Sequence, residues 1–358
     1  MILKSFKYST SDWLLDSLVL GKANLIVGKN SSGKSRALRA LTNVKHLISQ
    51  RNTVENTKSF KAEIILSDES DQITFLLEIG DRKVINEVLI LNDMTIINRD
   101  ENTAIINGEN VNPPADMLLM HVRRDVEKYP VIEKIIAWSE EAVIRSFIEP
   151  NSPTHDELYK IVSEFTPEMR KHVIEMANEV GFPLTEFNTF ENIINSIKKR
   201  SANTNPDLEK VKLILLYEKN VDTVLFLEDL SSGMYRTILL LILIEQLIHL
   251  NHPALIAIDD LGEGLDYSRA TKVGKLLFAV CEEHNIQLIA TSNEEFMMNI
   301  VDINQWNILV RNGEIVKSIT ATDHPEEFED FKFSGLNNFD FFTSDFLARI
   351  SSNLFPEN

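Results

Sequence analysis

The eight residues at positions 28–35 constrain the fold of this chain more than any other feature. They read Gly-Lys-Asn-Ser-Ser-Gly-Lys-Ser and fit the phosphate-loop pattern G-x-x-x-x-G-K-[S/T]. An apolar run, Asn24–Val27, precedes the loop, and a stretch with helical spacing of apolar residues begins near Arg36. In such a strand–loop–helix unit, backbone N–H groups and the positive end of the helix dipole point at a phosphate. The pattern predicts a nucleotide-binding α/β core.

The loop pattern also assigns roles to individual side chains. Lys34 is expected to neutralise the β- and γ-phosphates of ATP, and the Ser35 hydroxyl is expected to bind Mg²⁺. The predicted cofactors are therefore ATP and Mg²⁺. The predicted nucleotide contacts from this region are Gly28, Lys29, Asn30, Ser31, Ser32, Gly33, Lys34, Ser35 and Arg36.

An acidic motif follows an apolar run late in the chain. The run Ala254–Ile258 is apolar throughout, as expected of a strand buried in a parallel sheet, and it is followed by Asp259 and Asp260. Ligands of open α/β sheets bind at the carboxyl ends of the strands. We therefore predict that Asp259 holds Mg²⁺, directly or through water, and that Asp260 orients or deprotonates the attacking water.

A third motif, Ser231-Ser232-Gly233, opens a predicted helix over Met234–Leu250 and forms an anion site with its hydroxyls and free N–H groups. In this order and spacing, the motifs resemble those of ABC-type ATPases, whose signature caps the γ-phosphate of ATP held by the other subunit. The segment Gly264–Asp266 is similar to the family's D-loop, and 286–293 is similar to the strand that leads to its switch residue, here Asn293. The resemblance implies nucleotide contacts from Ser231, Ser232, Gly233 and Asp266.

Within that superfamily, residues 259–268 are most similar to the SMC/RecF-like branch and to the ATPase domains of overcoming-lysogenization-defect type proteins. The resemblance covers 24–35 and 228–293. It implies a homodimer, or a higher homo-oligomer, that closes around ATP and reopens after hydrolysis. Because too few residues follow Asn293 for the nuclease domain of some relatives, we expect a separate effector or toxin partner, in anti-phage defence or DNA-end processing.

Three departures from the family pattern bear on catalysis. The catalytic acid is Asp260 where the family usually has Glu, the switch is Asn293 where it usually has His, and no clear Q-loop glutamine is present, with 120–125 as a substitute. Because positioning and charge stabilisation dominate phosphoryl transfer, these changes predict slow hydrolysis rather than lost binding. Lys34, Asp260 and Asn293 are the predicted catalytic residues, and Glu263 is an alternative acid. Two alternatives stay open: an ATP-gated binding or inhibitor module with little hydrolysis, and the ATPase subunit of a transporter.

Periodicity along the chain predicts the domain organisation. The fold class is a P-loop ABC-type ATPase core of α/β type, with a mixed sheet, an antiparallel β lobe and a helical insertion. Within the insertion, apolar spacing predicts a first helix over 131–148. The predicted domains are lobe I at 1–120, the insertion at 121–222, lobe II at 223–323, and an acidic Phe-rich tail at 324–358, which either packs on the core or docks a partner.

Composition limits the cellular location and the classes of partner that we expect for this chain. With 36 basic and 54 acidic residues the net charge is −18, which favours a basic protein partner over a general nucleic-acid surface. Direct nucleic-acid contact through the basic clusters Arg123-Arg124 or Lys198-Lys199-Arg200 stays open. The single cysteine, the absence of a signal peptide and the absence of a membrane-length apolar run predict a cytoplasmic protein without membrane contact.

Overall fold

The computed structural model describes residues 1–68, 70–145, 155–190, 212–250, 253–343 and 345–355. The chain divides into two compact units, of which the first comprises 1–144, 252–260 and 281–358, and the second 145–251 and 261–280. The domain boundaries drawn from the sequence at 120, 222 and 323 stay predictions. The basic cluster Lys198–Arg200 lies outside the described residues.

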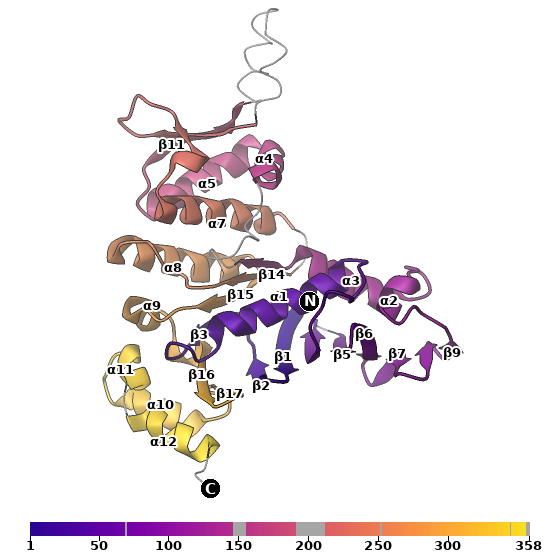
Figure 1. The fold of residues 1–358 in the computed structure, drawn as a ribbon. Coiled ribbons are helices and arrows are strands. Elements are labelled where there is room, and N and C mark those ends of the chain that lie inside the picture. The colour runs from indigo at the N-terminus through magenta and orange to yellow at the C-terminus, as the bar shows by residue number, and fades with distance from the viewer. Residues whose placement is uncertain (69, 146–154, 191–211, 251–252, 344, 356–358) are drawn as a thin grey trace, which may run out of the picture. The chain divides into compact units, whose positions relative to one another are not determined.

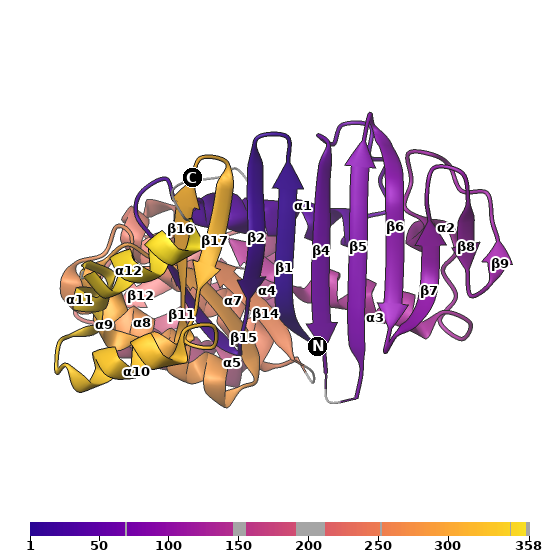
Figure 2. The ribbon, with the colours of Figure 1, turned by 90° about the horizontal axis from the view of Figure 1, so that it is seen from below.

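A sheet of 14 strands forms the first unit, in the order β10-β14-β15-β3-β16-β17-β2-β1-β4-β5-β6-β7-β8-β9. Figure 2 shows the strands from β16 to β7 side by side. The strands are β1 (Ile2–Thr10), β2 (Trp13–Val19), β3 (Ala23–Val27), β4 (Phe60–Ser67), β5 (Gln72–Gly80), β6 (Lys83–Leu91), β7 (Met94–Arg99), β8 (Ala104–Ile106), β9 (Glu109–Asn110), β10 (Val143–Arg145), β14 (Ala254–Ile258), β15 (Ile286–Thr291), β16 (Trp306–Asn312) and β17 (Ile315–Ile319).

The core of this sheet is parallel. β3 pairs in parallel with both β15 and β16, and β15 also pairs in parallel with β14. Every residue of β14 and β15 is buried, as the apolar sequence of β14 predicts. From β2 outward the pairs are antiparallel, and strands such as β5 alternate buried and partly exposed residues. This arrangement confirms the predicted α/β class with a mixed sheet and an antiparallel lobe.

Helices cover both faces of the sheet. α1 and α3 lie on one face, whereas α10, α11 and α12 lie on the opposite face near β16 and β17 (Figures 1 and 2). The helices of this unit are α1 (Lys34–Ser49), α2 (Leu119–Val122), α3 (Pro130–Glu141), α9 (Glu295–Ile300), the 3-10 helix η3 (Ile303–Gln305), α10 (Pro325–Phe333), α11 (Asn338–Thr343) and α12 (Asp345–Leu354).

The first helix of the predicted insertion is shorter than expected. Apolar spacing predicts a helix over 131–148, but α3 ends at Glu141 and Ala142 is extended, with φ −61° and ψ 121°. Residues Val143–Arg145 instead form β10 at the edge of the sheet beside β14. Two glutamates at the carboxyl end of α3 oppose the helix dipole, and the β-branched pair after them favours a strand. Positions 146–148 lie outside the described residues.

Two buried amides join the parallel core to the segments around it. Gln287 of β15 accepts the N–H of Leu3 and donates to the carbonyls of Leu3 and Gly21, at 2.7–2.8 Å. Asn24 of β3 donates to the carbonyls of Gly21 and Leu288 and accepts the N–H of Gly21. Because buried polar groups cost free energy unless they are hydrogen-bonded, these bonds fix the position of β3 and thus of the loop that follows it.

The second unit contains helices and a three-stranded antiparallel sheet, β11-β12-β13. This sheet was not predicted, so the insertion is not purely helical. The Thr166 hydroxyl caps α5 by accepting the N–H of Met169. α5 is joined to α7 by a hydrogen bond between His172 Nδ1 and the fully buried Glu245. The elements are α4 (His155–Ser163), α5 (Pro167–Glu179), β11 (Leu184–Thr189), β12 (Ile214–Glu218), β13 (Leu225–Phe226), η2 (Leu227–Asp229), α7 (Ser232–Ile248) and α8 (Tyr267–Glu283), of which the last residues of α8 belong to the first unit.

The Phe-rich tail packs part of its aromatic residues into a cluster. Phe328, Phe331 and Phe341 are buried, and the ring centroid of Phe341 lies 4.7 Å from that of Phe328 and 4.9 Å from that of Phe331. Phe333, by contrast, is 86% exposed. Core packing therefore accounts for three of the tail's phenylalanines. Across the described ranges, no helix combines the length and the apolar character that a membrane span needs.

Candidate functional site

The phosphate loop connects β3 to α1, as predicted. Its backbone needs glycine at both ends, since a Cβ on Gly28 would lie 2.4 Å from Ser32 Oγ and 2.8 Å from the carbonyl of Leu309. Gly33 has φ +108°, a left-handed conformation that glycine adopts without strain. No side chain caps α1, and its first turn carries no acidic residue, so its first N–H groups face the loop without a competing carboxylate.

Lys34 is folded into this loop. It is 6% exposed, and its ammonium donates a hydrogen bond of 2.9 Å to the carbonyl of Gly28. Burial lowers the pKa of Lys34, whereas the nearby carboxylates of Asp260 and Asp259 act in the opposite direction. The ammonium therefore lies between the loop and the two acids, where a phosphate would gain a cationic partner.

Asp259 and Ser35 meet at the carboxyl end of β14. The Ser35 hydroxyl donates to Asp259 Oδ1 at 3.1 Å, and the Thr291 hydroxyl donates to the same oxygen at 2.7 Å. Asp259 is 4% exposed, so its carboxylate is held in one position by two hydroxyls. A hydroxyl beside a carboxylate is the donor pair that Mg²⁺ takes from the protein when phosphate oxygens and water supply its other ligands.

Asp260 has an unusual backbone. Its φ is +50°, which is uncommon outside glycine, and its N–H donates to the Thr291 hydroxyl at 2.8 Å. Thr291 thus connects the backbone of Asp260 to the carboxylate of Asp259. The sequence comparison of motifs did not assign a role to Thr291, although it stands at the carboxyl end of the predicted strand.

Asn293 contacts the phosphate loop directly. Its side-chain amide donates to Asn30 Oδ1 at 2.8 Å. The predicted switch residue and a predicted loop residue are therefore in contact, across the end of β15. An amide can form this bond at any pH but cannot become cationic.

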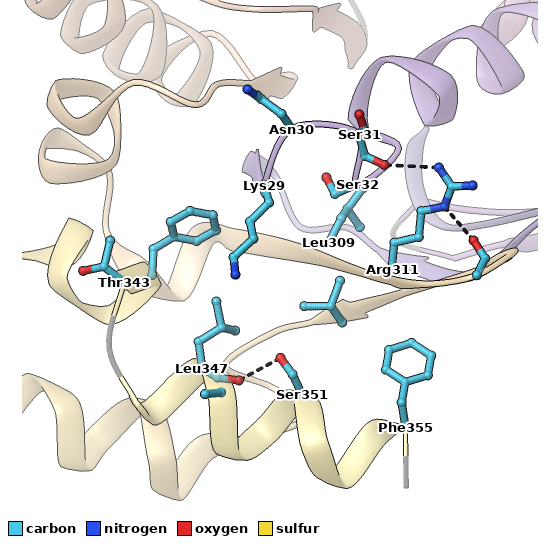
Figure 3. A pocket seen from close by; sticks show the side chains of 14 residues that line it. Lys29, Asn30, Ser31, Ser32, Leu309, Arg311, Thr343, Leu347, Ser351 and Phe355 are labelled. Carbon is cyan, nitrogen blue, oxygen red and sulfur yellow. Dashed lines mark hydrogen bonds between the residues drawn. The ribbon is translucent and has the colours of Figure 1, made fainter. Parts of the chain in front are cut away.

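Two arginines lie near the loop, but only one of them is hydrogen-bonded to it. Arg311 of β16, which the sequence did not single out, donates to the carbonyl of Ser31 at 3.3 Å and to that of Gly313 at 2.7 Å (Figure 3). Arg36, a predicted nucleotide contact, instead bonds to Asp12 at 2.8 Å and lies over the Trp13 ring at 4.8 Å. The structure thus joins Arg36 to the β1–β2 turn, and its role toward the nucleotide stays a prediction.

The signature motif lies in the second unit. Ser231 caps α7 by accepting the N–H of Met234, and α7 begins at Ser232. Gly233 packs against the predicted D-loop so closely that a Cβ would lie 2.3 Å from the carbonyl of Gly264. The two predicted motifs of this unit therefore form one surface.

The acids of that D-loop have partners of their own. Glu263 Oε2 accepts from Arg236 of α7 at 2.8 Å, an ion pair that competes with its role as an alternative catalytic acid. Asp266 accepts the N–H of Arg269 at 3.0 Å and thereby caps the start of α8. Its contact to nucleotide stays a prediction, as does the assignment of 120–125 in place of a Q-loop.

The residues of the first unit fit ATP and Mg²⁺. The uncapped start of α1, the enclosed Lys34 ammonium and the buried Ser32 hydroxyl, which has no hydrogen-bond partner among the described residues, are features that a bound phosphate would satisfy. Ser35 and Asp259 would hold the metal. ATP bound with Mg²⁺ would supply the γ-phosphoryl group that is transferred to water.

Comparisons with known proteins agree with this geometry. Residues 23–292 match the family described as "AAA domain, putative AbiEii toxin, Type IV TA system". Curated proteins include none that matches the sequence. A solved structure of an SMC head bound to the C-winged helix domain of ScpA is similar, with 12% identity, a TM-score of 0.57, and coverage of 91% of this chain and 100% of that chain.

A second similar structure is the SMC head domain with an extended coiled coil bound to the C-terminal domain of ScpA, derived from Pyrococcus furiosus. It shares 12% identity and a TM-score of 0.50, and the match covers 92% of this chain and 99% of that chain. The fold is therefore that of an SMC head, which confirms the predicted fold class of an ABC-type ATPase core. The likeness to overcoming-lysogenization-defect type proteins stays a prediction.

Proposed function

From the premise that the chain belongs to this family of AAA domains, whose description includes a putative toxin of a type IV toxin–antitoxin system, we propose that it dimerises around ATP as a switch. In this proposal the ATPase controls a separate effector or toxin. ATP binding closes the dimer, and slow hydrolysis reopens it.

One observation carries the proposal. Ser35, Asp259, Thr291 and Asp260 are connected by successive hydrogen bonds of 2.7–3.1 Å at the carboxyl end of β14, next to the Lys34 ammonium. This arrangement supports the proposed roles of these groups toward the metal, the γ-phosphate and the attacking water. The signature at Ser231–Gly233 supports a dimer, because the resemblance places this motif on ATP held by another subunit.

The proposal is tested by sedimentation of the purified chain with and without ATP and Mg²⁺. We expect monomers without nucleotide and dimers with ATP, most completely in Asp260→Asn, which retains the site but slows hydrolysis. Lys34→Ala removes the cation from the loop and is expected to abolish both ATP binding and the dimer. The matched lysine variant Lys4→Ala, on an exposed position of β1, is expected to dimerise normally. An ATP-dependent dimer of Lys34→Ala would overturn the proposal.

A second candidate is an ATP-gated clamp that holds its partner with little hydrolysis. Asn293 favours it, because this amide bonds to Asn30 and cannot transfer a proton as the family's histidine does. The side chain of Asp260, which is shorter than the family's usual Glu, also favours slow hydrolysis and thus the clamp. The two candidates differ in phosphate release by the purified protein. Steady turnover that disappears in Asp260→Asn supports the ATPase switch, whereas a dimer that persists for hours on ATP supports the clamp.

The partner and setting are also part of the proposal. The net charge of −18 favours a basic protein, and anti-phage defence or DNA-end processing is the proposed setting, in the cytoplasm. Burial raises the pKa of the single cysteine, Cys281, to about 12, so this thiol is suited to packing rather than to redox chemistry. Affinity purification from the native cell with ATP tests the partner. Recovery of a basic protein, released when Lys34→Ala replaces the wild type, supports the proposal.

A further inference from the structure

A large cavity lies beside the phosphate loop, on the side toward the C-terminal tail. Its volume is about 850 Å³, which is in the range of small-molecule sites. One wall is the loop segment Lys29–Ser32, a second is the end of β16, and a third is formed by α11, α12 and Phe355 (Figure 3). All of these residues belong to the first unit.

The cavity walls combine apolar and polar residues, and one of the two cations that line them has no side-chain partner among the described residues. Leu309, Phe342, Leu347 and Phe355 supply apolar surface. Figure 3 shows the Lys29 ammonium pointing into the space toward Leu347. In the described part of the chain no hydrogen bond or ion pair of the Lys29 ammonium is found, whereas the guanidinium of Arg311, the other cation of the lining, donates to the carbonyls of Ser31 and Gly313.

The charge of the lining contrasts with that of the whole chain. The chain has 54 acidic residues among 358, yet none of the fourteen residues that line the cavity is acidic. An exposed cation that lies beside apolar surface and has no counter-ion is matched by a ligand that is itself both anionic and apolar. A neutral apolar ligand would leave the ammonium unpaired, and a small hydrated anion would leave the walls uncovered.

We propose that this cavity is a second ligand site, which binds an amphipathic monoanion: a flat or short apolar body that carries one carboxylate, sulfonate or phosphate. The anionic group bonds to Lys29, and the body packs against Leu347 and Phe355. Because Lys29 belongs to the phosphate loop and Leu347 to α12, such a ligand contacts the loop and the tail at once. The cavity adjoins the predicted nucleotide site, because Lys29–Ser32 are also predicted nucleotide contacts, but Lys34 and Ser35, the predicted groups for the β- and γ-phosphates and Mg²⁺, do not line it.

The test is a fluorescence titration of the full chain with anilinonaphthalene sulfonate, compared with its uncharged counterpart phenylnaphthylamine. We expect one site for the sulfonate. Lys29→Met is expected to weaken sulfonate binding about five- to tenfold and to leave phenylnaphthylamine unchanged, because only the charged hydrogen bond is lost. The matched variant Lys4→Met should change neither affinity. Equal sulfonate affinity in Lys29→Met and the wild type would overturn the proposal.

Two further variants separate this site from other apolar surfaces and from the nucleotide site. Ala348→Trp fills the cavity from an exposed position of α12 and should abolish binding of both probes, whereas Ala348→Ser should not. Lys34→Ala should retain sulfonate binding. Loss of binding in Lys34→Ala, or persistence in Ala348→Trp, would contradict the proposal. Since the titration needs no nucleotide, its outcome is independent of whether the chain is an ATPase.

Discussion

Gly233 has no room for a larger side chain unless the backbone around it shifts. A Cβ there would lie 2.3 Å from the backbone carbonyl of Gly264 and 3.0 Å from Leu265 Cδ2. Backbone cannot move aside as a flexible side chain does, so we expect Gly233→Ala to lower the free energy of unfolding by about 1–3 kcal/mol. Urea unfolding measures the change. Gly21→Ala is the control, because its nearest neighbour lies 3.9 Å from the added Cβ, and equal stability of the two variants would contradict the prediction.

Glu87 is a fully buried carboxylate in β6. It accepts the N–H groups of Leu119 and Met120 at 2.6 and 3.0 Å, and Arg99 lies 3.9 Å away. Burial is the largest influence and raises the pKa of Glu87 to about 7. Because the folded state then binds the proton more tightly than the unfolded state, this residue's contribution to stability falls as pH rises from about 4.5 to about 7.

The pH dependence of Glu87 predicts in which direction the stability of a neutral variant changes with pH, relative to the wild type. Glu87→Gln cannot ionise, so the stability of the variant relative to the wild type should be higher at pH 7.5 than at pH 5. The size of this relative change is on the order of 1–3 kcal/mol. Urea midpoints of both proteins at the two pH values measure it. A relative stability that falls with rising pH would show that the two N–H donors and Arg99 hold Glu87 ionised.

At this scale, the site could be predicted where its chemistry is local in the sequence. Gly28–Ser35 lies in a motif whose own spacing predicts phosphate binding, Asp259 follows an apolar strand, and Ser231 was predicted from the order of the motifs and their resemblance to ABC-type ATPases. Thr291 and Arg311 could not be predicted, because their roles arise from contacts between strands distant along the chain. The burial of Glu87 could not be predicted either, because a polar residue in a strand is ordinarily expected on the exposed face.

At the scale of elements, β16 supports the phosphate loop. It pairs in parallel with β3 and places Arg311 under the carbonyl of Ser31. Without the guanidinium the loop would lose a hydrogen bond that fixes its curvature. We therefore expect Arg311→Met to weaken ATP binding about three- to tenfold. Calorimetric titration with ATP measures the affinity, with Arg51→Met, an exposed arginine after α1, as the control. Unchanged ATP affinity in Arg311→Met would mean that the loop holds its shape through its own backbone.

The elements that periodicity identified correctly are those with one strong pattern. α7 is apolar through 238–244, and β14 and β15 are fully buried, so their type followed from composition. The end of α3 could not be read in the same way, since Val143 and Ile144 continue the helical spacing while the pairing with the sheet edge makes them a strand. The β11–β13 sheet depends on pairing between 184–189 and 214–218, which no local pattern reveals.

At the scale of the whole molecule, the net charge of −18 acts on every association of the chain. Two copies repel each other at long range, whereas a basic partner is attracted. Salt screens both effects, because the Debye length falls from about 30 Å at 0.01 M to about 10 Å at 0.1 M. Self-association and partner binding are therefore expected to respond to salt in opposite directions.

The dissociation constant of the ATP-bound dimer should accordingly fall several-fold between about 0.02 M and 0.2 M salt, while that of the complex with a basic partner should rise. Sedimentation of Asp260→Asn with ATP measures the first quantity without interference from hydrolysis. Surface neutralisation by Glu326→Gln and Glu329→Gln, on α10 of the tail, removes two negative charges from each copy and should flatten the salt dependence. A dimer that weakens steadily with salt would instead mean that opposite charges paired across its interface outweigh the repulsion between the two chains.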